Sequence, residues 1–232
     1  MINLKNRSLQ KELLDADGIP FADIKINMQE LDTINSLLGG HAITLKGLRA
    51  FKQLPGSKIS VCEIGCGGGD NLRIISRYCS KKNITVQLTG IDIKQECINY
   101  AAERNAGFAA QWVCSDYSQV NLKNNPPDII FSSLFCHHFT RNELVEMMLW
   151  MKANCRLGFF INDLQRHPLA YYSIKWITKI FSGSYLVKND APLSVARGFT
   201  KNEWEEIFAK AGITNYSVKW KWAFRYLIVF KK

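Results

Sequence analysis

Apolar positions in the first quarter of the chain recur at helical spacing. Phe21–Leu38 and His41–Leu54 carry this pattern and are separated by Gly39-Gly40, which predicts two helices. Pro55-Gly56 then ends the pattern, and a different rhythm begins. We therefore expect residues 1–56 to form a helical lid segment, and residues 57–232 to form the main domain with an insert at 167–199.

From residue 58 onward, short apolar runs alternate with amphipathic segments. The runs predict strands at Lys58–Ile64, Ile84–Ile91, Phe108–Cys114, Asp128–Ser132 and Leu157–Asn162. The segments between them predict helices at Asp70–Cys79, Gln95–Asn105 and Arg141–Asn154. Strands that alternate with helices form parallel sheets through βαβ units, and such strands are buried on both faces. The sequence therefore predicts a doubly wound α/β fold.

The end of the chain departs from this alternation. Thr200-Lys-Asn-Glu203 is a capping box, which predicts a helix running to Gly212. Thr214–Lys221 and Phe224–Lys231 then predict two strands, joined by a connection that is long enough only for an antiparallel hairpin. The predicted sheet thus has seven strands, is mostly parallel and has one reversed strand near its C-terminal end.

The segment His167–Gly183 is apolar on most of its helical surface. Pro168 suits a first helical turn, and Lys175, Lys179 and Ser182 leave only a narrow polar stripe. A helix that is apolar all round is normally buried, so we expect it in the core or in the contact of a homodimer. The alternatives are the lining of a pocket for a large aromatic substrate, and membrane contact. With the N-terminal helices, Ser184–Arg197 is the natural lid.

Composition narrows the class of protein and its partners. A hydrophobic fraction of 47% with 22% charged residues is ordinary for a folded globular domain. Seven scattered cysteines indicate reduced thiols in the cytoplasm, and no run approaches the about 20 apolar residues of a membrane span. The net charge of +10 raises nucleic acid, an anionic membrane surface or an acidic substrate as partners. Because the basic residues are spread without a block, and no RNA-binding module is recognisable, we do not expect nucleic acid.

Candidate chemistry begins at the loop after the first strand. Residues 61–70 read VCEIGCGGGD, so a buried strand runs into four glycines in five positions and then into a helix that Asp70 could cap. Such a loop lets backbone approach a ligand, and the helix N-terminus offers free amide groups. Asp70 stands where the dinucleotide fingerprint has its last glycine, and no lysine follows as in a phosphate-binding loop. The loop therefore predicts a ligand without a phosphate, such as one that carries a sulfonium and an ammonium.

Two aspartates follow the next strands. Asp92 ends the second strand, where its carboxylate could accept hydrogen bonds from ribose hydroxyls, and Asp116 follows the third, where it could accept from an adenine amino group. Ligands of doubly wound sheets lie at the carboxyl ends of the strands. Either aspartate alone could simply cap a loop, but their common register with the glycine loop predicts a nucleoside site.

In these motifs the sequence resembles the class I S-adenosylmethionine-dependent methyltransferases over roughly residues 58–165. Glu63, Gly65, Gly67 and Gly69 match the acidic residue and G-x-G-x-G of that family's first motif. The resemblance implies S-adenosyl-L-methionine as cofactor and a Rossmann-like sheet with a final reversed hairpin.

The same resemblance assigns roles to single residues. It implies that Glu63 anchors the methionine end of the cofactor, Asp92 the ribose and Asp116 the adenine amino group. Ile93 and Tyr117 would flank the adenine ring, and Ser132, at the end of the fourth strand, completes the predicted cofactor site.

A pair of histidines gives the sequence evidence on the methyl acceptor. Residues 124–128, NNPPD, precede the fourth strand, so an amine-methylating motif fails on position and the prolines form a turn. His137 and His138 follow that strand, and either could be the base that deprotonates a hydroxyl acceptor, with His137 slightly preferred. Alternatively, one caps the following helix and the other packs against it. We expect no metal, because the adjacent Cys136, His137 and His138 cannot easily converge on one ion.

The segments HHF and INDLQRHPLAYY look like those of small-molecule methyltransferases, both of the ubiquinone/menaquinone type and those encoded beside aromatic polyketide synthases. We therefore expect O-methylation, or C-methylation, of a small aromatic or lipophilic hydroxyl-bearing acceptor. The alternatives are an RNA or protein methyltransferase, and a protein that binds an S-adenosyl ligand without turnover.

Overall fold

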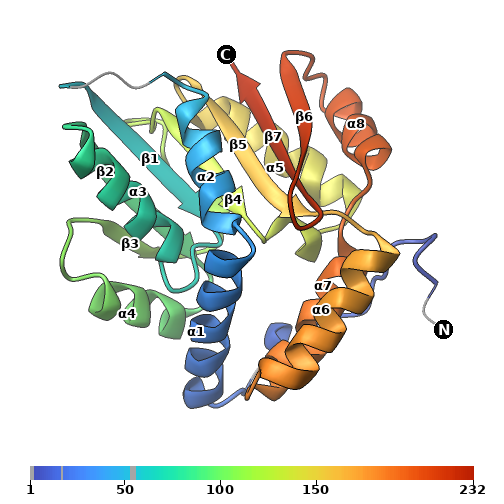
Figure 1. Ribbon diagram of the computed structural model, residues 1–232. Coiled ribbons are helices and arrows are strands. Elements are labelled where there is room, and N and C mark those ends of the chain that lie inside the picture. The colour runs from blue at the N-terminus through green and yellow to red at the C-terminus, as the bar shows by residue number, and fades with distance from the viewer. Residues whose placement is uncertain (1–2, 17, 53–55) are drawn as a thin grey trace.

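A single seven-stranded sheet organises the computed structural model, which describes residues 3–16, 18–52 and 56–232 (Figure 1). The strands are β1 (Lys58–Ile64), β2 (Thr85–Asp92), β3 (Gln111–Cys114), β4 (Ile129–Ser133), β5 (Gly158–Leu164), β6 (Tyr216–Lys221) and β7 (Arg225–Lys231). The α-helices are α1 (Phe21–Leu37), α2 (Gly40–Arg49), α3 (Asp70–Lys81), α4 (Gln95–Arg104), α5 (Arg141–Asn154), α6 (Pro168–Phe181), α7 (Tyr185–Arg197) and α8 (Lys201–Lys210). Three short 3-10 helices span Leu13–Asp15, Tyr117–Gln119 and Cys136–His138.

The strand order β3-β2-β1-β4-β5-β7-β6 confirms the predicted doubly wound topology. The pairs β1–β2, β1–β4, β2–β3 and β4–β5 are parallel, whereas β7 runs antiparallel to both β5 and β6. β7 is therefore the one reversed strand, as the short connection between the last two strands predicts. The chain order changes direction between β1 and β4, which places the carboxyl ends of both strands at the switch point of the sheet.

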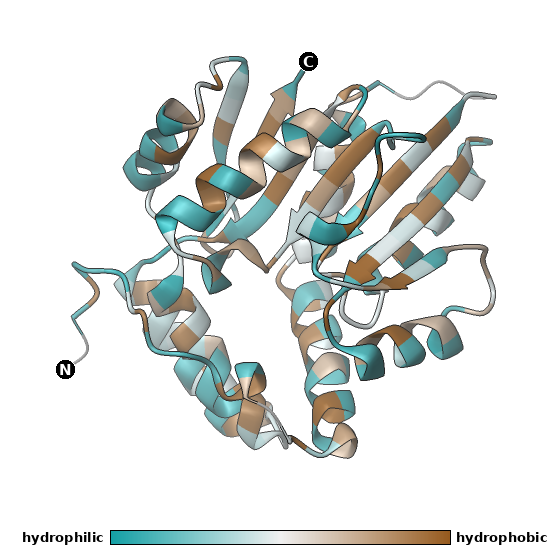
Figure 2. Ribbon diagram, turned by 180° about the vertical axis from the view of Figure 1, so that it is seen from behind, coloured by the Kyte–Doolittle hydropathy of each residue, from teal (hydrophilic) through white to brown (hydrophobic). Residues whose placement is uncertain are grey.

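Helices cover both faces of the sheet. On one face, α2 and α3 pack through Ile43, Leu48, Leu72 and Ile75 onto β1, β4 and β5. On the other, α5 and α8 bury their methionines and aromatic rings against the same strands and β7. Figure 2 shows this second face, with a helix lying across the strands. The sheet is thus a rigid support, and the helices on its two faces leave the row of strand ends uncovered.

Element boundaries differ from the predicted ones in a few places. The third strand is shorter, beginning at Gln111, and Phe108 instead packs edge-on against Trp112. α2 ends at Arg49, and the last part of the predicted helix His41–Leu54 lies outside the described residues. The expectation that Asp70 caps α3 is wrong: Gly69, in the left-handed region, is the N-cap, and Asp70 is the first helical residue.

The segment before α1 crosses the molecule to α7. Ser8 N donates to Ala196 O (3.0 Å), Arg7 Nε donates to Arg197 O (2.5 Å), and Arg197 Nη1 donates to Gln10 O (2.6 Å). α7 in turn packs against α6 and α1. These contacts bring segment 3–16, α1, α6 and α7 together beyond the strand ends, where they enclose a cavity.

Helix α6 is not buried as its composition predicts. Ala170 and Thr178 are its only fully buried residues, while Leu169, Trp176, Ile180 and Phe181 are more than half exposed. The buried arc is narrow because α6 packs mainly on one neighbour, α7, at the outside of the domain. This leaves an apolar surface that no other described part of the chain covers.

The cysteines are free thiols throughout the described residues. Cys114 is exposed, and the other six are buried. Within the same residues, none of the helices is long and apolar enough to cross a membrane.

Candidate active site

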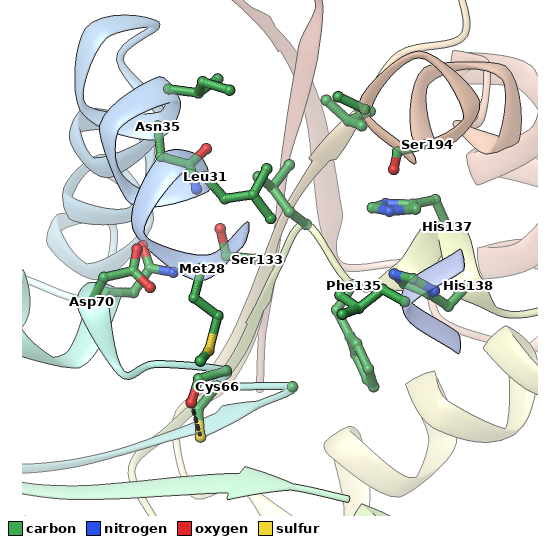
Figure 3. Close-up of a pocket in the computed structure, with 18 of the residues that line it drawn as sticks. Met28, Leu31, Asn35, Cys66, Asp70, Ser133, Phe135, His137, His138 and Ser194 are labelled. Atoms are coloured by element: carbon green, nitrogen blue, oxygen red, sulfur yellow. Dashed lines mark hydrogen bonds between the residues drawn. The ribbon is translucent and has the colours of Figure 1, made fainter. Parts of the chain in front are cut away.

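A cavity of about 640 Å³ opens at the carboxyl ends of β1, β2, β4 and β5. Its outer walls come from α1, α6, α7 and the turn between β6 and β7. Figure 3 shows Met28, Cys66 and Asp70 on one side of it, and the two histidines beneath Ser194 on the other. The two sides are distinct in construction, so each is described separately.

The glycine loop forms the first side. Gly65, Gly67 and Gly69 all have positive φ (69°, 47° and 71°), which explains why glycine stands at each position. A Cβ on Gly65 would lie 2.5 Å from the ring of Phe135, and one on Gly69 would overlap the ring of Trp112. A Cβ on Gly67 would meet nothing within 4 Å. Gly65 and Gly69 are thus required by internal packing, whereas Gly67 borders open space in the cavity.

Glu63 lies at the end of β1 behind this loop and is buried. Asn71 Nδ2 donates to its Oε1 (2.9 Å), while Oε2 has no hydrogen-bond partner among the described residues. Burial raises the pKa of Glu63 well above its usual range, and the neighbouring Asp70 adds to this shift. A buried carboxyl oxygen without a donor is expensive, so this position suits a ligand that brings a cation or an N–H group.

Asp92 ends β2 and is held by backbone amides. Gly67 N donates to its Oδ2 (2.9 Å) and Lys94 N to its Oδ1 (3.0 Å). Burial nevertheless raises its pKa, against these hydrogen bonds. Each oxygen keeps a further lone pair for a ligand hydroxyl, so the geometry fits the ribose role.

The predicted adenine residues also line the cavity, and they differ in how far the protein itself already contacts them. Asp116 is exposed, and its Oδ1 accepts from Ser118 N and Oγ (both 2.8 Å), so it caps the turn after β3. Tyr117 packs edge-on against Trp150, with ring centroids 5.3 Å apart. Ile93 leaves 68% of its surface exposed and offers an apolar wall.

Two predicted cofactor residues do not line the cavity. Ser132 is fully buried, and its Oγ accepts from the thiol of Cys136 (3.8 Å), because its side chain points into the core. The next residue, Ser133, faces the cavity instead, since successive side chains of a strand alternate between faces. Gly69 lies beneath the loop as the N-cap of α3.

His137 stands at the centre of the second side. Its Nδ1 lies 2.7 Å from Asp163 Oδ1, and its backbone N donates to Asp163 Oδ2 (3.0 Å). Asp163 is fully buried on β5. Burial opposes ionisation, but the charge and hydrogen bond of His137 outweigh it and lower the pKa of Asp163. A carboxylate at Nδ1 fixes the tautomer with its proton there, which leaves the Nε2 lone pair directed away from the core.

Glu12 and Asp15 complete this side from the N-terminal segment. Glu12 Oε1 lies 3.6 Å from His137 Nε2, longer than a hydrogen bond, and accepts from Ser194 Oγ (2.8 Å). Burial raises the pKa of Glu12 to about 7, although the charge of His138 opposes this. Asp15 Oδ1 lies 3.0 Å from His138 Nδ1. Burial works against ionisation of Asp15, but the hydrogen bond and charge of His138 lower its pKa to about 2.

Two arginines hold the histidine turn from outside. Arg7 Nη2 and Arg197 Nε donate to His137 O (2.5 and 3.0 Å), and Arg197 Nη2 donates to His138 O (2.8 Å). The capping alternative fails for both histidines, because Thr140 caps α5 through a complete capping box. Sequence reasoning missed Glu12, Asp163 and Arg197, which lie far from the histidines along the chain.

The geometric reason for expecting no metal does not hold. Ligand atoms of Glu12, His137 and His138 all lie within 4.8 Å of one another, as do those of Asp32, His41 and Asp70. Most of these groups already have partners: Asp32 accepts from Arg73 and Arg104 (both 2.7 Å), and His138 pairs with Asp15. The absence of a metal therefore stays a prediction.

Sequence comparison bears on the region that carries the loop and the aspartates. Residues 61–158 match a family model described as a methyltransferase domain. The match covers less than half of the chain, from within β1 to the start of β5. No curated protein matches the chain by sequence.

Solved structures extend the comparison to the whole fold. A SAM-dependent methyltransferase from Aquifex aeolicus shares 19% identity at a TM-score of 0.62, over 92% of this chain and 99% of that one. The plantazolicin methyltransferase BpumL, solved with SAH and a pentazolic desmethyl analogue, shares 22% at 0.63, over 85% and 72%. The magnesium protoporphyrin IX methyltransferase of Synechocystis PCC 6803, solved with SAH, shares 16% at 0.53, over 94% and 90%. Domain match and fold confirm the predicted class, an S-adenosylmethionine-dependent methyltransferase.

Proposed function

We propose that the protein transfers the methyl group of S-adenosylmethionine to the hydroxyl oxygen of a small, lipophilic aromatic acceptor. The observation that carries this proposal is the buried Asp163–His137 pair, whose histidine lines the same cavity as Gly67 and Asp92. A base oriented by a carboxylate, beside a nucleoside site, is the arrangement that oxygen methylation requires.

The first side of the cavity supplies the cofactor residues. Glu63 would receive the methionine end through its unpartnered oxygen, and Asp92 would accept from the ribose hydroxyls. Asp116, Ile93 and Tyr117 would surround the adenine. When bound, the cofactor contributes an electrophilic methyl carbon on a positively charged sulfur.

The second side deprotonates and positions the acceptor. The cofactor would supply its methyl group to the acceptor oxygen, and its sulfur would keep the electron pair of the broken carbon–sulfur bond. The hydroxyl proton moves to His137 Nε2, and Asp163 stabilises the resulting imidazolium through Nδ1. Glu12 and His138 add a second proton-accepting pair at the same place, and Arg197 keeps the turn in position.

The lipophilic class of the acceptor is supported by the remaining walls. Met28, Leu31, Ile174 and Ile177 also line the cavity, and most of its surface is apolar. Two of the similar structures are methyltransferases named for small molecules, plantazolicin and magnesium protoporphyrin IX. We propose that residues 1–56 and the insert 167–199 act as the lid over this acceptor, and that the protein works in the reducing cytoplasm, for which its free thiols suit it.

The test begins with cofactor binding. S-adenosylhomocysteine should raise the melting temperature, because a ligand that binds only the folded state stabilises it by mass action. NAD serves as the matched control, since it also contains adenosine but carries a pyrophosphate. Stabilisation by NAD without any effect of S-adenosylhomocysteine would overturn the proposal.

Turnover then separates the acceptor classes. We expect transfer of labelled methyl from S-adenosylmethionine to lipophilic phenols. The basic net charge of +10 favours RNA as the second candidate acceptor. Labelling of RNA or protein but not of phenols would show that the acceptor is a macromolecule and not a small aromatic compound. Binding of S-adenosylhomocysteine without turnover on any acceptor in a host metabolite extract would indicate a non-catalytic protein.

A further inference from the structure

Helix α6 presents an apolar stripe to solvent. Leu169, Trp176 and Ile180 are between 60% and 66% exposed, and Phe181 is 81% exposed. Spacings of seven and four residues place Leu169, Trp176 and Ile180 on one line along the helix. Isolated exposed apolar residues are ordinary, but a continuous line of large ones marks an interaction surface.

The stripe borders the cavity. Ser173 and Ile177 lie next to it on the helix surface, and both line the cavity together with Ile174 and Ala170. One helix therefore carries two adjoining faces, an apolar face toward solvent and a face toward the acceptor. An apolar molecule on the stripe would thus lie beside Ile177 and the lining of the cavity.

Cations accompany the stripe. Lys175 Nζ lies 5.9 Å from the ring centroid of Tyr171, and Lys179 Nζ lies 5.5 Å from that of Trp176. These two lysines are the only charged residues of α6, which contains no acidic residue. An apolar stripe flanked by lysines and aromatic rings has the composition of a helix that lies in a membrane interface.

The turn between β6 and β7 repeats this composition at the other rim of the cavity. Trp220 and Trp222 are 53% and 72% exposed, and both line the cavity mouth. Lys219 and Lys221 stand beside them, and burial together with Lys46 and Lys219 lowers the pKa of Lys221.

The two rims form one surface. Trp220 Nε1 donates to Oε1 of Gln165 (2.9 Å), which lies just before α6. The ring of Phe224 stacks on that of His167, the N-cap of α6, with ring centroids 4.7 Å apart. Figure 1 shows α6 and this turn on the same side of the molecule. The nearby acids are engaged elsewhere: Glu30 accepts from Gly183 N and Ser184 N, and Asp23 accepts from Tyr185 Oη, all at the far end of α6.

We propose that this surface, formed by Leu169, Trp176, Ile180, Phe181, Trp220 and Trp222, docks on an anionic lipid bilayer. Indole rings favour the headgroup region of bilayers, and each lysine near an anionic surface strengthens binding. The acceptor then enters the cavity directly from the lipid, between α6 and the β6–β7 turn. This entry route rests on the proposed lipophilic acceptor, whereas the docking itself depends only on the surface.

Vesicle co-sedimentation tests the docking. Phosphatidylcholine vesicles with phosphatidylglycerol should retain the protein, and vesicles of phosphatidylcholine alone should retain it much less, because the lysines need anionic partners. The double variant Trp176→Ser/Ile180→Ser should bind anionic vesicles at least tenfold more weakly. Lys175→Glu/Lys179→Glu should lose a similar factor and should also lose the dependence on salt.

Matched variants of residues outside this surface serve as controls. Leu149→Ser/Leu157→Ser removes two side chains that are 45% exposed, and Lys123→Glu/Lys210→Glu reverses two exposed charges; neither pair lines the cavity. Both controls should bind like the unchanged protein. Melting temperature and S-adenosylhomocysteine affinity should be unchanged in all four variants, which separates loss of docking from loss of folding or of cofactor binding.

Three results would overturn the proposal. These are no retention of the unchanged protein by anionic vesicles, equal losses in the control variants, or a protein dimer that Trp176→Ser/Ile180→Ser dissociates while vesicle binding is absent. The last result would assign the stripe to a second copy of the chain. If S-adenosylhomocysteine failed to bind while anionic vesicles still retained the protein, the proposed function would fail and the docking surface would stand.

Discussion

The two sides of the cavity are built from the chain in opposite ways. The cofactor side uses Glu63, the glycine loop and Asp92, which lie within 30 residues and on neighbouring parallel strands. The acceptor side joins Glu12, His137, Asp163 and Arg197, which are spread over most of the chain. In the proposed function, local motifs would thus hold the cofactor, and long-range contacts would form the part of the site that selects the methyl acceptor.

The largest expected effect falls on the acceptor side. His137→Ala should lower kcat by about 10²–10⁴-fold, the usual contribution of a general base, with S-adenosylhomocysteine affinity unchanged. The rate should also depend less on pH in the variant, because the group that accepts the proton has been removed. His138→Ala, the control, should lose less, since His138 is only partly buried and pairs with Asp15.

Losses of about tenfold or less in both histidine variants, with an unchanged pH profile, would contradict this role. Catalysis would then rest on holding the acceptor oxygen and the methyl carbon in line.

Glu12→Gln tests the acceptor side of the cavity through the pH dependence of the free energy of unfolding. Burial raises the pKa of Glu12 to about 7 in the folded protein, above its ordinary value of 4.5. The folded state therefore binds the proton more tightly, and stability falls as pH rises between these two values, by about 3 kcal/mol in total. In Glu12→Gln this fall should disappear, as measured by urea unfolding at pH 5 and pH 8. The low pKa of Asp15 adds no slope in this range, since Asp15 is ionised in both states.

A pH dependence of stability that is identical in Glu12→Gln and in the exposed control Glu206→Gln would show that Glu12 is not buried in solution as it is here.

On the cofactor side, Asp92→Ala should weaken S-adenosylhomocysteine binding by about 10- to 100-fold, the value of a hydrogen bond to a charged group. Asp116→Ala should cost less, because Asp116 is exposed and its Oδ1 already accepts from Ser118. Isothermal titration calorimetry measures both. Equal losses of affinity in the two variants would mean that Asp116 contributes as much to binding as Asp92, against this expectation.

Of two variants of the glycine loop, Gly67→Val should lose less stability than Gly69→Val, although it should lose cofactor binding. Gly67→Val should cost about 1–3 kcal/mol of unfolding free energy from its positive φ, and should abolish cofactor binding by filling the cavity side of the loop. Gly69→Val should be clearly less stable than Gly67→Val, because its side chain would also overlap Trp112. Urea unfolding and thermal shift distinguish the two. Unchanged S-adenosylhomocysteine affinity in Gly67→Val would show that the loop does not hold the cofactor.

The same contrast explains what the sequence could reveal. Period and glycine spacing predicted the seven strands, the reversed β7 and the row of strand ends, because these depend on local pattern and on connection length. Ser132 was assigned to the cavity in place of Ser133, because a shift of one residue in the strand end reverses the side-chain direction.

The partners of His137 could not be found from the sequence. Glu12 lies in a polar N-terminal segment and Asp163 near the end of an apolar strand, and no spacing rule connects them to residue 137. The exposure of α6 was missed for a related reason. Composition shows that a helix is apolar, but only the packing shows whether another element covers it.

The hydrogen bonds that tie segment 3–16 to α7 impose an order on folding. Arg7 and Gln10 pair with Arg197, nearly the full chain away, so these contacts close a very long loop. During synthesis the sheet strands from β1 to β5 emerge long before Arg197, and the cofactor side can assemble while the acceptor side still lacks its second wall. We therefore expect a growing chain to complete the proposed methyl-donor site first, and the turn that carries His137 to gain its arginine support only when α7 has left the ribosome.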